Sequence, residues 1–259
     1  MDRPDDNDLV RTQFDAQAER FANWAAGLNQ QYAQGYFDFC GLSAHDTMLD
    51  VACGPGDFAL FCAARVARVT GVDISEKELA IACERTRALS LDNVEFLRED
   101  VERLPFEVSS FSAVVCRSAL HHMPRRTAVF EEMVRCCRPG GKLSVLDIAA
   151  YDDPFANAFF EELERRVDQS HCATLTQKAM FDLFRHAEIP IVRTFAVEVP
   201  LNMREYREHA AHSEADAAAI DDILRRGQGD PRVTPHLLVE SGELFFKRNV
   251  LLVLGQKPV

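Results

Sequence analysis

The sequence predicts an α/β fold with a doubly wound, mostly parallel seven-stranded sheet of the Rossmann-like type. An N-terminal helical segment precedes this sheet, and a helical cap is inserted before its last strands. Two observations support the prediction. Short apolar strands alternate with amphipathic helices from residue 47 to residue 149. A turn after the first strand carries Gly54, Gly56 and Ala59, which match the G-x-G-x-x-G/A spacing.

Composition and charge narrow the class of protein. The chain has 259 residues, of which 47% are hydrophobic and 27% charged, as is usual for a globular domain. The net charge of −12 argues against a nucleic-acid partner, because phosphates select a basic face. Residues 1–8 are polar and no apolar run is long enough to cross a bilayer, so we expect a cytoplasmic protein without a membrane span. The sequence leaves a homodimer open.

The elements of the first half follow from apolar spacing. Residues 1–40 are predicted to form a helical lid segment, because apolar residues have helical spacing between residues 9 and 39. Residues 41–150 are predicted to form the core. Its strands are expected over 47–53, 69–73, 93–97, 111–116 and 142–149, with helices over 57–66 and 127–137. A further helix begins after Ser75, where Ser75 and Glu78 have the spacing of a capping box.

After residue 150 the regular alternation of strands and helices ends. Residues 151–259 are predicted to be the C-terminal part of the same domain. Helices are expected over 154–167, 176–187 and 203–226, and strands over 189–199 and 244–254. Two late strands separated by a helical segment predict a hairpin-like pair that finishes the sheet, with a helical cap between them.

Three carboxylates suggest what the glycine turn binds. Asp50 lies at the end of the first strand, Asp73 ends the second, and Asp100 follows the third. Ligands of open α/β sheets bind at the carboxyl ends of the strands, so these acids are expected at one edge. A turn that binds nothing is the structural alternative. A dinucleotide leaves Asp50 and Asp100 without a role, and no Lys-Ser or Lys-Thr follows the loop to hold a triphosphate. S-adenosylmethionine (SAM), which has no phosphate, fits better.

The sequence resembles a known family in five motifs. LDVACGPGDFA, VTGVDIS, NVEFLREDVERLPFEVSSFSAVVC, RSALHHM and VRCCRPGGKLSVLDI occur in the order and spacing of class I SAM-dependent methyltransferases. The resemblance is to the ubiquinone/menaquinone C-methyltransferase-like, small-molecule subgroup (methyltransferase type 11). It implies an enzyme that transfers a methyl group from SAM to a small, partly apolar metabolite and releases S-adenosyl-L-homocysteine (SAH).

The same resemblance assigns cofactor-binding roles by position. Asp50 would orient the loop and reach the ammonium of the cofactor, and Arg117 would meet its amino-acid end. Asp73 would accept both ribose hydroxyls, and Asp100 would accept from the adenine amine. The complete implied set is Asp50, Ala52, Cys53, Gly54, Gly56, Asp73, Ile74, Asp100, Val101 and Arg117.

The transfer step needs alignment and, for some acceptors, a base. His121 and His122 follow the fourth strand and are the candidate catalytic residues, although both imidazoles could instead pack structurally. The aromatic residues of the N-terminal segment and of the segment after residue 150 also have two interpretations. They could pack in the core, or they could form a lid over the substrate. The candidate substrate and lid residues are Phe14, Phe21, Tyr32, Tyr151 and Phe155.

Other signals are weaker. The eight cysteines include no C-x-x-C pair, so we expect reduced thiols, and no metal site is predicted. His171 and Cys172 are interpreted as residues that lead into a helix. Two alternative functions stay open. The chain could bind SAM or SAH without methyl transfer, as a non-redox cyclase or a regulator would. Less favoured is a nicotinamide-dependent oxidoreductase.

Overall fold

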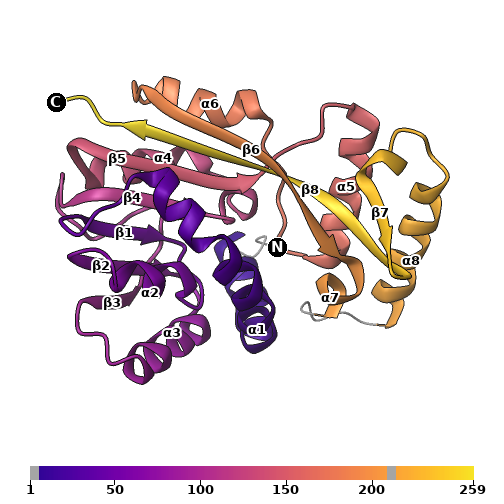
Figure 1. Cartoon of the computed structure of the whole chain (residues 1–259), viewed down its shortest axis with the longest axis horizontal. Helices are drawn as coiled ribbons and strands as arrows, with labels where there is room; N and C mark the ends of the chain where they lie inside the picture. Colours follow the sequence, from indigo (N-terminus) through magenta and orange to yellow (C-terminus); the bar gives the residue numbers. More distant parts are fainter. Residues whose placement is uncertain (1–5, 209–213) are drawn as a thin grey trace, which may run out of the picture.

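The computed structural model describes residues 6–208 and 214–259, without the side chains of residues 6, 7, 21, 24–30 and 214. A single mixed sheet runs through the molecule (Figure 1). Its strand order is β3-β2-β1-β4-β5-β8-β6, and β7 pairs with β8 outside this path. The strands are β1 (Thr47–Val51), β2 (Arg68–Asp73), β3 (Val94–Arg98), β4 (Phe111–Arg117), β5 (Cys137–Ile148), β6 (Ile191–Asn202), β7 (Leu237–Glu240) and β8 (Glu243–Gln256).

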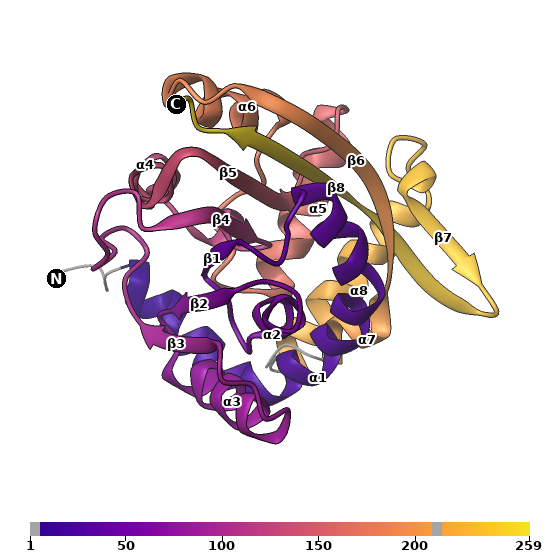
Figure 2. The ribbon, with the colours of Figure 1, turned by 60° about the vertical axis from the view of Figure 1, so that its left-hand side comes forward.

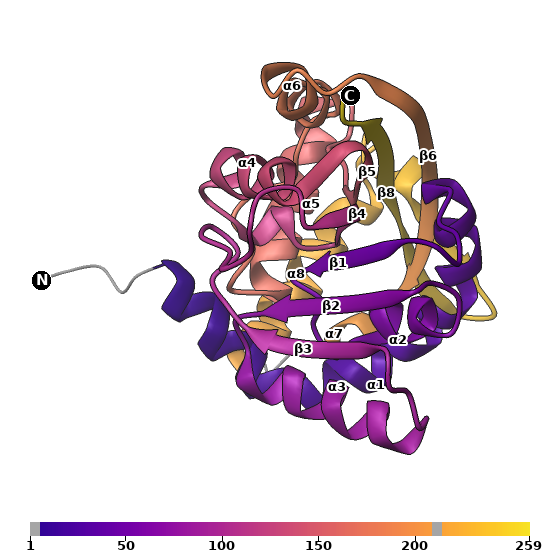
Figure 3. The same ribbon diagram turned by 90° about the vertical axis from the view of Figure 1, so that its left-hand side faces the viewer.

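The pairing directions confirm the predicted fold class. Strands β1 to β5 pair with one another in parallel, and β8 is antiparallel to β5, β6 and β7. Figure 3 shows the parallel strands stacked in this order, with the crossover helices beside them. The long late pair, β6 and β8, completes the seven-stranded path as the sequence indicates.

The eighth strand, β7, was not predicted. It joins β8 through a two-residue loop, Ser241-Gly242, because Glu240 pairs with Glu243. Both loop residues have positive φ, 52° and 83°, as a tight primed hairpin turn requires. A Ser-Gly step between two apolar runs is a hairpin signal, so the sequence does carry the information.

The helices lie close to their predicted places. Within the predicted helix over 203–226, the described residues form α7 and α8, and residues 209–213 lie outside the described ranges. The α-helices are α1 (Asp6–Cys40), α2 (Asp57–Ala63), α3 (Glu76–Ala88), α4 (Arg126–Cys136), α5 (Pro154–Val167), α6 (Gln177–His186), α7 (Met203–Glu208) and α8 (Glu214–Gln228), with short 3₁₀ turns η1 (Leu120–His122) and η2 (Thr234–His236).

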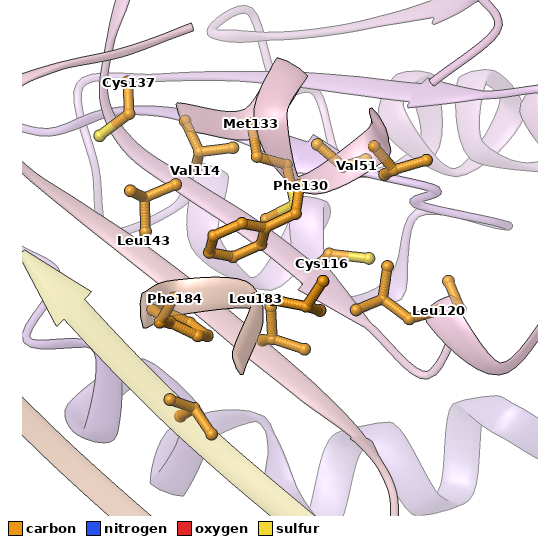
Figure 4. Packing of buried hydrophobic residues seen from close by; sticks show 14 of the residues in the cluster. Val51, Val114, Cys116, Leu120, Phe130, Met133, Cys137, Leu143, Leu183 and Phe184 are labelled. Carbon is orange, nitrogen blue, oxygen red and sulfur yellow. The ribbon is translucent and has the colours of Figure 1, made fainter. Parts of the chain in front are cut away.

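Two apolar layers hold the sheet, one on each face. On one face α4 and α6 pack on β1, β4 and β5, with the rings of Phe130 and Phe184 4.6 Å apart between their centroids (Figure 4). On the other face α1 and α2 pack on the same strands, with Tyr36 against Phe58 at 4.9 Å. Because strand side chains alternate between faces, the parallel strands are buried on both sides.

A third cluster supports the far ends of β6 and β8. Helices α5, α7 and α8 pack there around Phe160 and Phe246. Figure 1 shows β6 and β8 running from the core to this layer, and Figure 2 shows α1 crossing near it. The arrangement leaves α1 between the core and the C-terminal layer, next to the carboxyl ends of β1 and β2.

Two smaller expectations can be compared with the described residues. All eight cysteines lie in the described ranges, and each carries a thiol rather than a disulfide. No helix within those ranges is long and apolar enough to cross a membrane.

Candidate active site

The glycine turn is shaped by close neighbours. Gly54 and Gly56 have positive φ, 53° and 79°, which favours glycine. A Cβ on Gly56 would lie 2.8 Å from the ring of Phe96, and one on Gly54 would lie 2.9 Å from a carboxylate oxygen of Glu78. The turn therefore packs tightly against α3 and β3 while its other side faces a cavity.

That cavity, of about 720 Å³, lies at the carboxyl ends of β1, β2 and β4. Its size is in the range of ligand pockets. Besides His121 and His122, fifteen site residues were predicted from the sequence. All but four of these fifteen line the cavity, and so do both histidines. The predicted residues that line it are Asp50, Ala52, Cys53, Gly54, Asp73, Ile74, Asp100, Val101, Arg117, His121, His122, Phe14 and Tyr32.

The remaining four predicted residues lie elsewhere or outside the described side chains. Gly56 shapes the turn but does not line the cavity. Tyr151 packs on Phe160, with ring centroids 4.3 Å apart, and its hydroxyl donates to a backbone carbonyl of β8. Phe155 is 43% exposed on α5. We therefore no longer assign Tyr151 and Phe155 to the site, because they stabilise the C-terminal layer. The side chain of Phe21 lies outside the described residues.

Asp50 and Arg117 give the cavity opposite charges at one end. Asp50 is 2% exposed, and burial raises its pKa to about 7, against the effect of the Arg117 guanidinium. The guanidinium carbon of Arg117 lies 4.7 Å from the ring centroid of Phe58. Its Nε is buried and, within the described residues, has no hydrogen-bond partner. A buried donor and a buried carboxyl side by side fit a zwitterionic amino acid.

Asp73 shapes the turn and still has acceptor capacity. One of its oxygens accepts from the amide of Gly54 at 2.8 Å, and the other accepts from the amide of Ser75 at 2.9 Å. Each carboxylate oxygen has two lone pairs, so both can accept again. Burial raises the pKa of Asp73, and the two amides oppose that rise. The residue fits a ribose diol.

Glu78 was missed as a site residue. Ser75 accepts from its amide at 3.2 Å, which confirms half of the predicted capping box. The reciprocal bond is absent because Asp73 already accepts from the amide of Ser75. The carboxyl of Glu78 instead lines the cavity, is 2% exposed, and has one oxygen without a partner among the described residues. Burial and the nearby Asp73 raise its pKa well above the usual value.

His121 is held by a buried carboxylate. Its Nδ1 lies 2.5 Å from Oδ1 of Asp147, which is fully buried on β5. Although burial raises the pKa of Asp147, the adjacent His121 and the amide of Ile148 lower it overall. An ionised Asp147 accepts from Nδ1–H, so the tautomer of His121 leaves Nε2 as a proton acceptor. Asp147 was not predicted as a site residue.

His122 has a different support. The Ser170 hydroxyl donates to Asp168 at 2.6 Å, so its oxygen accepts from Nδ1 of His122, 3.0 Å away. Burial and the neighbouring His121 lower the pKa of His122 to about 3, so the ring is neutral near pH 7. The two imidazole centroids lie 4.0 Å apart, and the edge of Phe14 meets His122 at 5.0 Å.

A buried ion pair closes the far end of the cavity. Arg248 on β8 makes a bidentate pair with Glu164 on α5, in which Nε donates to Oε1 at 3.1 Å and Nη2 donates to Oε2 at 2.8 Å. The Tyr206 hydroxyl donates to the same carboxylate. His171 lines the cavity beside this pair and lies 3.2 Å from Glu161. The interpretation of His171 as a lead into a helix missed this placement, because its partner comes from a separate helix.

The groups around the glycine turn can be compared with those of an organic cofactor. No group of three or more His, Cys, Asp or Glu side chains in the described ranges has metal-binding geometry. The polar groups around the glycine turn are instead matched to a carboxylate, an ammonium and a diol. Those three groups are the amino-acid and ribose parts of SAM.

Comparison with known proteins finds a matching family. Residues 48–141 match the family model described as "Methyltransferase domain". This stretch of the chain is similar to a methyltransferase domain. The resemblance to class I SAM-dependent methyltransferases is thereby confirmed, and the matched range holds the glycine turn, Asp73 and both catalytic candidates.

Relatives and solved structures agree with the methyltransferase domain. The chain is 38% identical over 115 residues to 27-O-demethylrifamycin SV methyltransferase of Amycolatopsis mediterranei, a match that covers 44% of this chain and 42% of that relative. It thus spans less than half of that protein. The crystal structure of YcgJ from Bacillus subtilis has a TM-score of 0.80 at 20% identity, covering 89% of this chain and 99% of that one.

The same fold occurs with a different chemistry. The crystal structure of the [4+2]-cyclase SpnF has a TM-score of 0.73 at 17% identity, and the likeness covers 100% of this chain and 99% of that one. At such low identity the likeness concerns the fold alone. The activity must therefore be argued from the side chains around the cavity.

Proposed function

We propose that this protein transfers a methyl group from SAM to a hydroxyl group of a small, partly apolar molecule. The single observation that carries the proposal is the His121–Asp147 pair, because His121 lines the same cavity as the glycine turn and buried Asp147 holds its Nδ1. A cofactor site alone would suit a regulator or a cyclase. An imidazole held by an ionised carboxylate adds a base, which a hydroxyl acceptor needs.

The cofactor is held by groups at four strand ends. Arg117 would pair with its carboxylate and Asp50 with its ammonium, because these two side chains are adjacent and opposite in charge. Asp73, with its remaining lone pairs, would accept from the ribose hydroxyls. Ile74 and Val101 would pack on the adenine, and Asp100 would accept from its amine. Bound SAM supplies an electrophilic methyl group on a sulfonium.

Proton removal is the contribution of the protein to the chemistry. Nε2 of His121 accepts the hydroxyl proton as the oxygen forms its bond to the methyl carbon, and the methyl–sulfur bond breaks on the opposite side. The imidazolium that results is stabilised by Asp147, as in other carboxylate–histidine pairs. In-line alignment of the reacting atoms supplies much of the rate, and the cavity walls exclude water.

Several properties support a small acceptor. The net charge of −12 disfavours a nucleic acid, and the site is a cavity of about 720 Å³ rather than a flat surface. The named acceptor of the 27-O-demethylrifamycin SV methyltransferase is also a small molecule, and its name indicates an oxygen acceptor. A cytoplasmic location, a homodimer and the division into residues 1–40, 41–150 and 151–259 stay predictions.

The test separates cofactor binding from transfer. SAM with a labelled methyl group is incubated with phenols and alcohols, and SAH binding is measured by calorimetry. We expect transfer to at least one hydroxyl acceptor, and a loss of about 10²–10⁴-fold in His121→Gln with SAH binding unchanged. His45→Gln, at an exposed position, is the matched control. SAH binding without transfer to any acceptor, or full transfer by His121→Gln, would contradict the proposal.

A further inference from the structure

One face of the late strand pair continues the cavity. On β6 the cavity is lined by Phe195, Val197 and Val199, which alternate along the strand and therefore share a face. Their partners on β8 are Leu252, Val250 and Arg248 in that order, and all three of these also line the cavity. Side chains from two strands thus form one continuous surface.

The next strand extends the same surface. On β5, Leu146 pairs with Leu252, and Ile148 pairs with Val250. Two rows of three apolar side chains result, and we call them the β6–β8 wall. The first row is Phe195, Leu252 and Leu146, and the second row is Val197, Val250 and Ile148.

Charged groups mark both ends of the β6–β8 wall. Beyond Val199 lies the Arg248–Glu164 pair. Beyond Phe195 lies Arg193, whose guanidinium donates to the carbonyl of Phe39 on α1 at 2.9 Å. From Phe195 to Val199 the strand rises about 13 Å. Because both arginines already have partners on other elements, the stretch between them is left to apolar contacts.

The β6–β8 wall and the proposed base line the same cavity. Leu146 and Ile148 flank Asp147 in the chain, but side chains alternate along a strand, so Asp147 points to the other face of β5 from these two wall residues. On β6, Phe195 lines the cavity and yet is 56% exposed, so the cavity is open there. A cavity that holds a base and an apolar wall with an opening suits a molecule with a reactive hydroxyl at one end and a hydrocarbon body behind it.

We propose that the β6–β8 wall binds the hydrocarbon body of the acceptor, an extended alkyl or flat apolar group, whose outer end leaves past Phe195. This inference rests on the proposed function, because it uses the hydroxyl at His121 to fix the orientation. It adds the class of acceptor: a hydroxyl compound with an apolar body long enough to cover the two rows of the wall.

The test uses a ladder of 4-alkylphenols, from 4-methylphenol to 4-hexylphenol. Each CH₂ that reaches the wall is expected to raise kcat/KM by about three- to fourfold until the chain passes Phe195. Phe195→Ser is expected to lower kcat/KM for 4-hexylphenol by about tenfold and to leave 4-methylphenol nearly unchanged. The nearly isosteric Val197→Thr should also reduce the increase of kcat/KM with alkyl chain length.

The matched control is Val192→Ser. Val192 is on the same strand and 55% exposed, like Phe195, but it does not line the cavity. It should leave the ladder unchanged. A ladder without dependence on chain length, or an equal loss in Val192→Ser and Phe195→Ser, would overturn the wall as a binding site.

A binding measurement separates this inference from the proposed function. The 4-alkylanisoles carry the methyl already and need no base, so their calorimetric affinity in the presence of SAH reports on the wall alone. Affinity that rises with chain length while no phenol is methylated would support the wall and contradict the proposed function. If phenols are methylated but the affinity for anisoles does not depend on chain length, the result would support the proposed function and contradict the wall as a binding site.

Discussion

The cavity has two halves that are built in different ways. The cofactor half consists of the glycine turn and the ends of β1, β2 and β3, and most of its contacts join residues within 30 positions of each other, such as Gly54 and Asp73. The acceptor half contains one pair within this range, His121 and Asp147, but it also joins elements far apart in the chain, such as Arg248 and Glu164, 84 residues apart. The cofactor, which is the same in all such enzymes, is thus bound by a local sequence motif. The acceptor is bound by residues from several elements, and these residues can change without changing the cofactor site.

The largest expected effect lies in the acceptor half. Asp147→Asn should lower kcat by about 10²–10⁴-fold, because the amide can no longer hold His121 in the tautomer that leaves Nε2 free. KM for SAM and the affinity for SAH should stay within about twofold if the halves are independent. Steady-state kinetics and calorimetry on the same preparation measure both.

Asp152→Asn controls for the charge change, because Asp152 is exposed and only five residues away. A variant Asp147→Asn that keeps full kcat, or one that loses SAH binding as strongly as turnover, would show that Asp147 acts through the fold rather than through His121.

The next effect belongs to the cofactor half. Asp73→Ala should weaken SAM binding by about 1–3 kcal/mol, because the ribose hydroxyls lose a charged acceptor. Part of this loss comes from the Gly54 amide, which Asp73 also fixes. Asp73→Asn keeps one acceptor and should lose less. Calorimetric affinity equal to that of the unchanged protein would remove Asp73 from the site.

The two halves should also respond differently to pH. Burial lowers the pKa of His122 to about 3, against about 6.5 when unfolded. Between these values the unfolded chain binds the extra proton, so His122 lowers the free energy of unfolding as the pH falls. The loss is about 2 kcal/mol at pH 5. Denaturant unfolding of the protein and of His122→Gln at pH 7 and pH 5 should give a smaller pH dependence in the variant, and equal slopes would be the contrary result.

In the cofactor half the pH effect should appear in binding. Burial raises the pKa of Asp50 to about 7, and only the ionised carboxylate attracts an ammonium. SAM affinity should therefore rise by up to about tenfold from pH 6 to pH 8, one pH unit of linkage being about 1.4 kcal/mol. The carboxyls of Asp73 and Asp57 and the guanidinium of Arg117 face Asp50 and shift its midpoint. Asp50→Asn should remove this dependence, and an unchanged pH profile in the variant would assign it to another group.

The contrast between the halves explains what the sequence could predict. The glycine turn, Asp50, Asp73 and Asp100 were found because a parallel sheet brings strand ends to one edge. His121 was found for the same reason, since it follows β4. These residues all line one cavity, and their common position could be predicted without knowledge of side-chain packing.

The missed residues depend on pairings that spacing does not encode. Asp147 reads as an ordinary strand residue until β4 and β5 are aligned, and only then does it meet His121. Glu78 has the spacing of a capping box, but Asp73 takes its expected partner. The apolar residues of β6 have the pattern of a core strand, yet Phe195, Val197 and Val199 line the cavity. Tyr151 and Phe155 do not line the cavity: Tyr151 packs within the C-terminal layer, and Phe155 is exposed on α5.

The central claim is that the cavity holds an adenosyl sulfur compound and not a dinucleotide. Calorimetric titration with SAH, repeated in the presence of excess NADH, tests it most directly. The account predicts one SAH bound per chain, with an affinity that NADH leaves unchanged and Asp73→Ala weakens. Displacement of SAH by NADH, or no heat of binding with SAH, would contradict it.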